Sequence, residues 1–186
     1  MHKTNTKNLT LSAMFVAIGL VLPFLTGQIP QFGNMLLPMH IPVFLCGLIC
    51  GWRYGTVVGF MLPLMRYAIF GMPILFPTGI SMAFELATYG LVVGLWYGKS
   101  RWKCIISLYR SMIAAMLCGR IVWGIVQIIL LGMSGNSFSW QVFMTEAFIN
   151  AIPGIIVQLI LIPVIMLALN RTGLLTLRTG HIRKHV

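Results

Sequence analysis

The feature that most constrains this chain is a series of six long apolar runs, separated by short segments that hold the charges and the turn residues. A helix of about 20 apolar residues crosses a hydrocarbon core about 30 Å thick. Only 8% of the 186 residues are charged, whereas soluble domains carry roughly 25%. So few charges exclude a soluble enzyme, a secreted disulfide scaffold and a disordered tail, because polar groups must cover any surface that faces water. The chain is predicted to be an integral membrane protein.

The runs predict an all-α membrane protein, with six transmembrane helices packed into one domain over residues 1–186. The expected spans cover residues 9–26, 35–51, 54–70, 78–97, 105–133 and 143–169. Pro38 and Pro42 are expected in the first turns of the second span, since proline is tolerated where a helix begins. Residues 71–77, which hold two prolines and a glycine, are expected to form a compact turn.

The distribution of Lys and Arg predicts the orientation of the six spans. All but two of the 13 basic residues lie before the first span, after the last, or in and beside the second and fourth connections. They are Lys3, Lys7, Arg53, Lys99, Arg101, Lys103, Arg110, Arg171, Arg178, Arg183 and Lys184. The opposite loops, 27–34, 71–77 and 134–142, contain none. Because cytoplasmic loops carry the excess of Lys and Arg, both termini are predicted to be cytoplasmic.

The net charge of +11 comes from small clusters between apolar runs. Proteins that bind nucleic acid gather Lys and Arg on one polar face, so the expected partner is the lipid bilayer and no nucleic acid. The four cysteines fit no paired zinc-binding spacing and are interpreted as packing residues. They are Cys46, Cys50, Cys104 and Cys118. We expect no metal site and no catalytic residues.

Four charged residues are expected within the membrane, where a charge needs a partner or a function. Arg66, Glu85, Arg120 and Glu146 would either pair as two buried salt bridges or line a polar pocket. Polar side chains converge on the outer half of several predicted helices, which favours an outward-opening pocket. The candidate substrate-binding residues are Asn34, His40, Arg66, Tyr67, Glu85, Arg120, Trp123, Gln127, Glu146 and Asn150.

Several of these candidates have an alternative interpretation. His40, next to two prolines, is either a helix-end histidine or a ligand-binding group. Trp123 is either core packing or a platform on which a ring stacks. Glu146 either lines the pocket or lies in the outer headgroup region.

Small residues at a spacing of four allow helices to approach closely in a membrane. Gly47, Gly51, Gly55 and Gly59 keep that spacing, as do Gly90, Gly94 and Gly98. In the first span the corresponding residues are Ala13 and Ala17. Such a pair either packs inside the bundle or binds another membrane protein.

Three runs of sequence carry a resemblance to a known family. They are AMFVA at 13–17, NMLLPMHIP at 34–42, and a stretch from FGMP at 70–73 through FP at 76–77 to AFELA at 83–87. With the length and the six-span topology, these runs make nearly the whole chain similar to the S components of energy-coupling factor (ECF) vitamin transporters, the subunits that bind the substrate.

The resemblance implies a transport function rather than an enzyme. An S component binds a vitamin near the extracellular side and docks, through the alanine pair of its first helix, onto a transmembrane coupling subunit that carries two cytosolic ATPases. The alanines that match the motif are Ala13 and Ala17. The chain would need no cofactor of its own, because the partner ATPases use the ATP. The expected location is the plasma membrane of a bacterium.

The vitamin itself is weakly encoded. Pantothenate is favoured, because arginine binds a carboxylate through two hydrogen bonds. Pyridoxine or hydroxymethylpyrimidine comes next, with its ring on Trp123 and a hydrogen bond to Glu85. The main alternative is a stand-alone, ion-coupled secondary transporter of a small polar solute, which would show inverted repeats and a broken helix. A membrane enzyme and a purely structural subunit are further alternatives.

Overall fold

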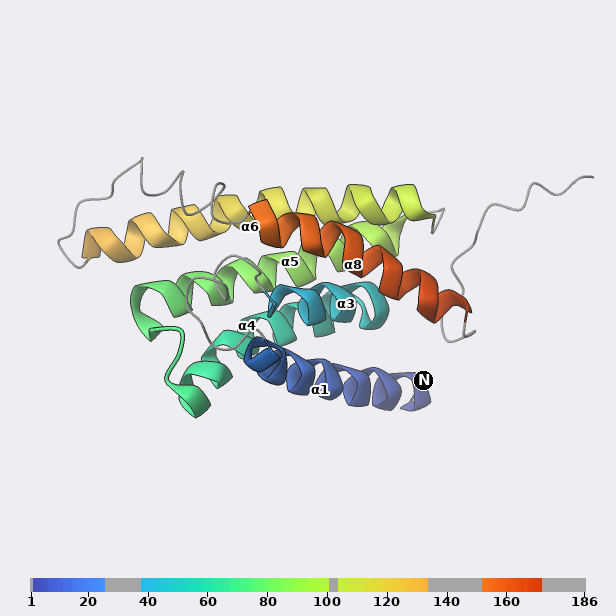
Figure 1. Ribbon diagram of the computed structural model, residues 1–186, viewed down its shortest axis with the longest axis horizontal. Helices are drawn as coiled ribbons and strands as arrows, with labels where there is room; N and C mark the ends of the chain where they lie inside the picture. The colour runs from blue at the N-terminus through green and yellow to red at the C-terminus, as the bar shows by residue number, and fades with distance from the viewer. Residues whose placement is uncertain (1, 26–37, 101–103, 134–151, 172–186) are drawn as a thin grey trace, which may run out of the picture.

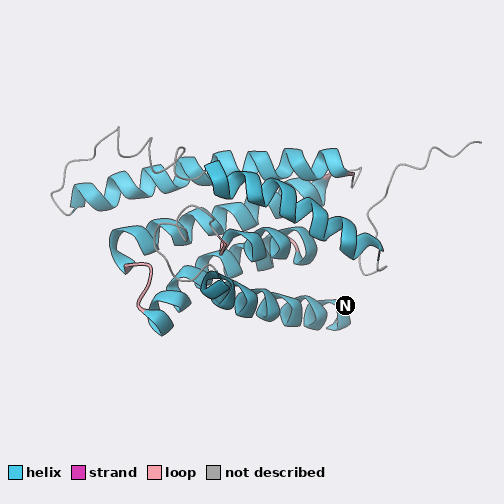
Figure 2. Ribbon diagram, viewed as in Figure 1, coloured by secondary structure: helices cyan, strands magenta, loops and turns pink. Residues whose placement is uncertain are grey.

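The computed structural model describes residues 2–25, 38–100, 104–133 and 152–171. Every regular element in these segments is helical (Figure 2). The α-helices are α1 (His2–Leu25), α3 (His40–Cys50), α4 (Trp52–Phe70), α5 (Ile80–Lys99), α6 (Ile105–Met133) and α8 (Ile152–Arg171). A short π-helical turn, η1 (Leu75–Gly79), precedes α5. The expectation of an all-α protein is confirmed for this part of the chain.

Helix α3, the shortest of the described α-helices, lies at the centre of the bundle. Figure 1 shows α1 on one side and α6 and α8 on the other, with α3, α4 and α5 between them. Helix α3 contacts α1, α4, α5 and α8, and ten of its 11 residues are buried. Its apolar side chains form much of the core, including Val43 and Phe44, which are fully buried. A helix that is apolar all round belongs in such an interior position.

Four helical segments of the described chain are long and apolar enough to cross a membrane. They are Thr6–Pro23 in α1, Leu75–Lys99 across η1 and α5, and the whole of α6 and α8. Helix α3 rises only about 16 Å at 1.5 Å per residue, roughly half of a hydrocarbon core. Helix α4 has 19 residues, but Arg53 and Arg66 lower its hydropathy. The chain is therefore a helical membrane protein with four candidate spans among the described residues. The six spans expected from the sequence stay a prediction.

Several element bounds differ from the expected ones, and the prolines account for two of them. Helix α3 begins at His40 rather than residue 35, so Pro42 lies in its first turn and Pro38 precedes it. Residues 71–77 were expected to be one compact turn, but η1 begins at Leu75. Its Gly79 N–H donates to the Ile74 carbonyl, five residues back. Pro77 has no N–H to donate, so regular α-helical bonding starts only with α5.

The remaining bounds differ less. Helix α1 begins at His2, so the polar residues that precede the apolar run are also helical. Helix α6 covers the same residues as the expected span. Helix α8 begins at Ile152, and the first part of the expected sixth span, residues 143–151, lies outside the described residues.

Glycines bring the backbones of α3, α4 and α5 into contact. A Cβ atom on Gly55 would lie 2.6 Å from the Cα of Gly47, and one on Gly90 would overlap the Gly55 carbonyl. Likewise, a Cβ on Gly59 would overlap the Leu86 carbonyl. Gly51 has φ +93° and joins α3 to α4, so the glycines at 47–59 do not form one helix face. This close packing fixes the height at which α5 presents its polar residues.

The helix ends and junctions that carry most of the basic residues lie at one end of the bundle. The start of α1, the α3–α4 junction, the end of α5, the start of α6 and the end of α8 lie at the right-hand end of Figure 1. We call this the basic end; its described basic residues are Lys3, Lys7, Arg53, Lys99, Arg110 and Arg171. The first and last described helices therefore have their outer ends on the same side. The assignment of that side to the cytoplasm stays a prediction.

Candidate functional site

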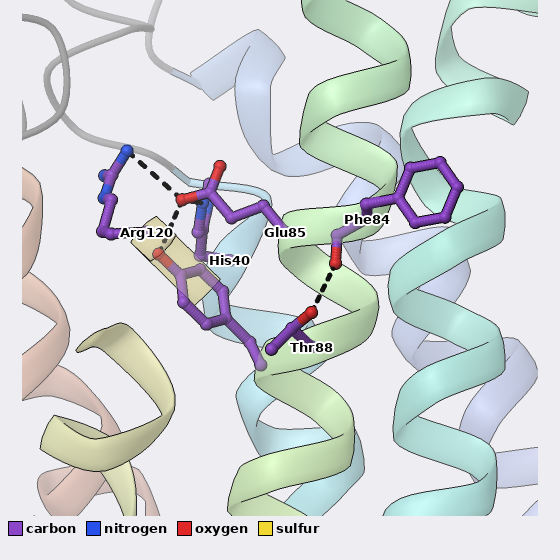
Figure 3. A network of polar contacts seen from close by, with 6 residues as sticks. His40, Phe84, Glu85, Thr88 and Arg120 are labelled. Carbon is purple, nitrogen blue, oxygen red and sulfur yellow. Dashed lines mark hydrogen bonds and ion pairs between the residues drawn. The ribbon is translucent and has the colours of Figure 1, made fainter. Parts of the chain in front are cut away.

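A buried carboxylate, Glu85 of α5, lies at the centre of the polar residues. It is only 2% exposed, and a buried charge must be paired and hydrogen-bonded. Its Oε1 atom lies 3.2 Å from Nη1 of Arg120 on α6 and accepts a 2.6 Å hydrogen bond from the Tyr89 hydroxyl. Nε2 of His40, at the start of α3, lies 3.9 Å from the same oxygen (Figure 3). We call His40, Glu85, Tyr89 and Arg120 the Glu85 cluster.

Local sequence explains why these four side chains meet. Glu85 and Tyr89 are four residues apart on α5 and so lie on one helix face. The Tyr89 ring stacks on Phe44 at 5.1 Å between centroids and lies 5.3 Å from the ring of His40. On α6, a Cβ on Gly119 would overlap the Tyr89 ring. Glycine at that position lets α6 approach α5, which brings the next residue, Arg120, to Glu85.

A second polar contact joins α5 to α6 one turn nearer the start of α5. The Ser81 hydroxyl donates to Oε1 of Gln127 at 2.6 Å and also lies 2.9 Å from the Pro77 carbonyl. Ser81 is fully buried. The two helices are thus linked at two successive levels, through Ser81 with Gln127 and through Glu85 with Arg120.

Arg66 approaches the cluster from the end of α4. Its Nη1 atom lies 3.0 Å from Sδ of Met39, the residue that precedes His40. A thioether is a weak acceptor for a guanidinium. The contact therefore brings a second cation beside the start of α3 and leaves most of its hydrogen-bonding capacity unused.

Within the described residues, several buried nitrogen atoms around the cluster have no hydrogen-bond partner. They are both ring nitrogens of His40, one of which carries a proton in the neutral ring, Nε of Arg66 and Nη2 of Arg120. A buried polar group left unpaired costs about 1–3 kcal/mol. The cluster has more donors than its own acceptors satisfy, so its chemistry suits a ligand that brings acceptor oxygens.

The structure brings some of the candidate residues together and separates others. His40, Glu85 and Arg120 meet directly. Gln127 instead contacts Ser81, and Arg66 contacts Met39. Tyr67 is 38% exposed and takes no part in the contacts of the cluster. Trp123 is half-buried on α6, three residues after Arg120. Asn34, Glu146 and Asn150 lie outside the described residues. Whether any of these residues contacts a ligand stays a prediction.

Sequence reasoning missed the aromatic part of the cluster. Tyr89 and Phe44 were not singled out, although Tyr89 follows Glu85 by one helical turn, the spacing at which side chains on a helix meet. The structure also shows that Glu85 and Arg120 form an ion pair, where the salt-bridge interpretation expected two such pairs. Glu146, which a second pair would need, lies outside the described residues.

The alanines of α1 face outward. Ala13 and Ala17 are exposed together with Met14 and Ile18, whereas Ser12 and Phe15 are buried against the bundle. The Ser12 hydroxyl lies 3.6 Å from Sγ of Cys46 on α3, one of the contacts that fix the rotation of α1. The alanine pair therefore lies on the surface rather than in the core.

Comparison with known proteins gives one match. The family model described as "ECF transporter, substrate-specific component" matches residues 7–166 of the chain. The match covers all the helices from the second turn of α1 to most of α8, and with them every residue of the Glu85 cluster. No curated protein and no solved structure is significantly similar to the chain.

Proposed function

Because this chain belongs to the family of ECF transporter substrate-specific components, we propose that it captures a small water-soluble vitamin at the Glu85 cluster. Members of this family are binding subunits of transporters rather than enzymes. Three features of this chain remain to be assigned: the residues that bind the substrate, the identity of the vitamin, and the surface that docks onto the coupling subunit.

The observation that carries the proposal is the set of unpaired buried donors around a single paired carboxylate. A purely structural network is expected to satisfy its buried polar atoms, because each one left unpaired is costly. Here His40, Arg66 and Arg120 all keep buried nitrogens without a partner among the described residues. A ligand with carboxylate, hydroxyl or carbonyl oxygens would supply the missing acceptors.

The donor-rich character favours pantothenate as the ligand. Its carboxylate would accept hydrogen bonds from Arg66 or Arg120, and arginine–carboxylate bonds are among the strongest in proteins. Its hydroxyl and amide groups would contact His40 and Glu85. Pyridoxine and hydroxymethylpyrimidine, which carry no carboxylate, would instead stack on Trp123 and donate to Glu85.

Delivery would use the outward face of α1. We expect Ala13 and Ala17 to dock onto a transmembrane coupling subunit, because two small side chains allow a partner helix to approach closely. Two cytosolic ATPases attached to that subunit would supply the energy, and this chain would bind no ATP. The basic end would face the cytoplasm of a bacterium, in accord with the excess of Lys and Arg there.

The test is to identify what the protein retains and prefers. The full chain is purified in detergent, bound small molecules are identified by mass spectrometry, and the affinities for pantothenate, pyridoxine and hydroxymethylpyrimidine are measured by titration calorimetry. We expect one of the three to bind at least tenfold more tightly than the others, and pantothenate to be that one. Binding of none of them, with no retained vitamin, would contradict the proposal.

A further inference from the structure

A second site lies at the basic end, in a groove between the end of α5 and the first turns of α6. The groove encloses about 770 Å³, and its lining includes Trp96, Lys99, Ser100, Ser107, Arg110 and Leu117. We propose that it binds an anionic phospholipid, with the phosphate between Lys99 and Arg110 and an acyl chain along α6. This inference does not depend on the vitamin or on where it binds.

The charges of the groove favour an anion. Lys99 and Arg110 are both exposed and both line it, whereas no acidic side chain does. The whole chain has only two acidic residues, and the described one, Glu85, is buried in its own cluster. The two cations are therefore not neutralised from within the groove. A phosphodiester would accept hydrogen bonds from both, since lysine and arginine are the usual partners of phosphate oxygens.

The shape of the apolar wall distinguishes a lipid from a free anion. Ile106, Ile113 and Leu117 lie on one face of α6 and are 65%, 48% and 56% exposed. They extend from the basic end towards the middle of the helix, as an acyl chain would. Trp96, which also lines the groove, is 55% exposed, and tryptophan is enriched at the level of lipid headgroups. Inorganic phosphate would leave this wall uncovered.

A hydrogen bond between the two helices holds the groove in shape. The Ser107 hydroxyl on α6 donates to the Ser100 hydroxyl at 2.7 Å, which ties the residue after α5 to the first turn of α6. Arg110 and Arg120 are ten residues apart on α6, or about 15 Å along the helix axis. The groove is thus separate from the Glu85 cluster, and variants at one site should leave the other site unchanged.

The experiment compares lipid retention by native mass spectrometry. The full chain in detergent is titrated with phosphatidylglycerol and, separately, with phosphatidylcholine. We expect wild type to prefer phosphatidylglycerol and each of Lys99→Gln and Arg110→Gln to lower that preference about fivefold. Arg53→Gln is the matched control, because Arg53 lies at the same end but its guanidinium is 5.3 Å from the Trp52 ring, outside the groove. It should keep the wild-type preference.

A steric variant and a fluorescence measurement make the test independent of charge. Ala114→Phe should fill the groove and weaken retention of both lipids without altering a charge. Phosphatidylglycerol with brominated chains should quench the fluorescence of wild type more than that of Trp96→Phe. Equal preference in wild type and in the Lys99→Gln/Arg110→Gln double variant would overturn the proposal. So would an equal loss in Arg53→Gln, or displacement of the lipid by millimolar inorganic phosphate.

Discussion

The Tyr89 hydroxyl and the Arg120 guanidinium meet at the same oxygen of Glu85, at 2.6 Å and 3.2 Å respectively. The phenol belongs to α5, the helix of Glu85 itself, and the guanidinium belongs to α6. One carboxylate oxygen therefore makes a contact within its own helix and a contact between two helices. His40 brings α3 to the same point, at 3.9 Å. A change at Glu85 is therefore expected to affect both the stability of the bundle and the binding of a ligand.

Replacement of the Glu85 carboxylate allows its effects on stability and on ligand affinity to be measured separately. Glu85→Gln keeps the size of the side chain but leaves Arg120 as a buried cation without its partner, which costs about 3–5 kcal/mol. We expect a clear fall in the unfolding temperature in detergent and a loss of vitamin affinity of at least tenfold. Both are measured on the same purified sample, the first by fluorescence-monitored melting and the second by calorimetry.

The control for this variant lies one turn away on the same helix. The Thr88 hydroxyl bonds only the Phe84 carbonyl of its own helix, at 2.8 Å, and is outside the cluster (Figure 3). Thr88→Ala should leave affinity and melting temperature close to wild type. If Glu85→Gln melts early but binds normally, the ion pair is structural and the vitamin binds elsewhere.

Removal of one hydroxyl tests the hydrogen bond of Tyr89. Tyr89→Phe preserves the stack on Phe44 and the packing against Gly119, and removes only the donor to Glu85. A hydrogen bond to a charged group contributes about 1.5–3 kcal/mol, so a loss of stability within that range is expected. Tyr89→Leu should cost more, because the ring contacts are then lost as well. Equal melting temperatures for Tyr89→Phe and wild type would mean that the hydroxyl is dispensable.

The sequence predicts helices well where a run of apolar residues is enough to define them. It predicts less where the packing of one helix on another determines which side chains meet. The long apolar run of α6 predicts that helix, because the run contains no proline to break it. Helix α3 begins later than its apolar run, since Pro38 and Met39 are apolar but form a turn rather than helix. The charges alone allowed either a salt bridge or a pocket. The meeting of Glu85 with Arg120 depends on how closely Gly119 lets α6 approach, which no single-helix pattern reveals.

Close packing of α4 on α5 gives a sharp test through glycine. Gly90→Ala would place a methyl group on the Gly55 carbonyl, and backbone atoms cannot move aside cheaply. We expect a loss of roughly 1–3 kcal/mol, as in other overpacked sites. Gly98→Ala on the same helix has nothing within 4 Å of the new methyl group. It should keep or raise stability, because alanine favours a helix by about 1 kcal/mol over glycine. Similar melting temperatures for the two variants would contradict close packing of α4 on α5 at Gly90.

The outward alanines of α1 allow docking to be tested apart from binding. Ala13→Trp and Ala17→Trp add large side chains to an exposed face, so the bundle has room for them. A partner helix docked on this face would have no room for them, because helices approach closely in a membrane only where the side chains are small. We expect vitamin uptake by cells to fall to the background of the deletion strain, while the purified variants bind the vitamin as wild type does.

Ile125→Trp, at a 53% exposed position of α6, controls for bulk on a membrane-facing surface and should transport normally. Full uptake by both alanine variants would show that the coupling subunit docks on another face, and weakened binding would mean that α1 supports the binding site instead.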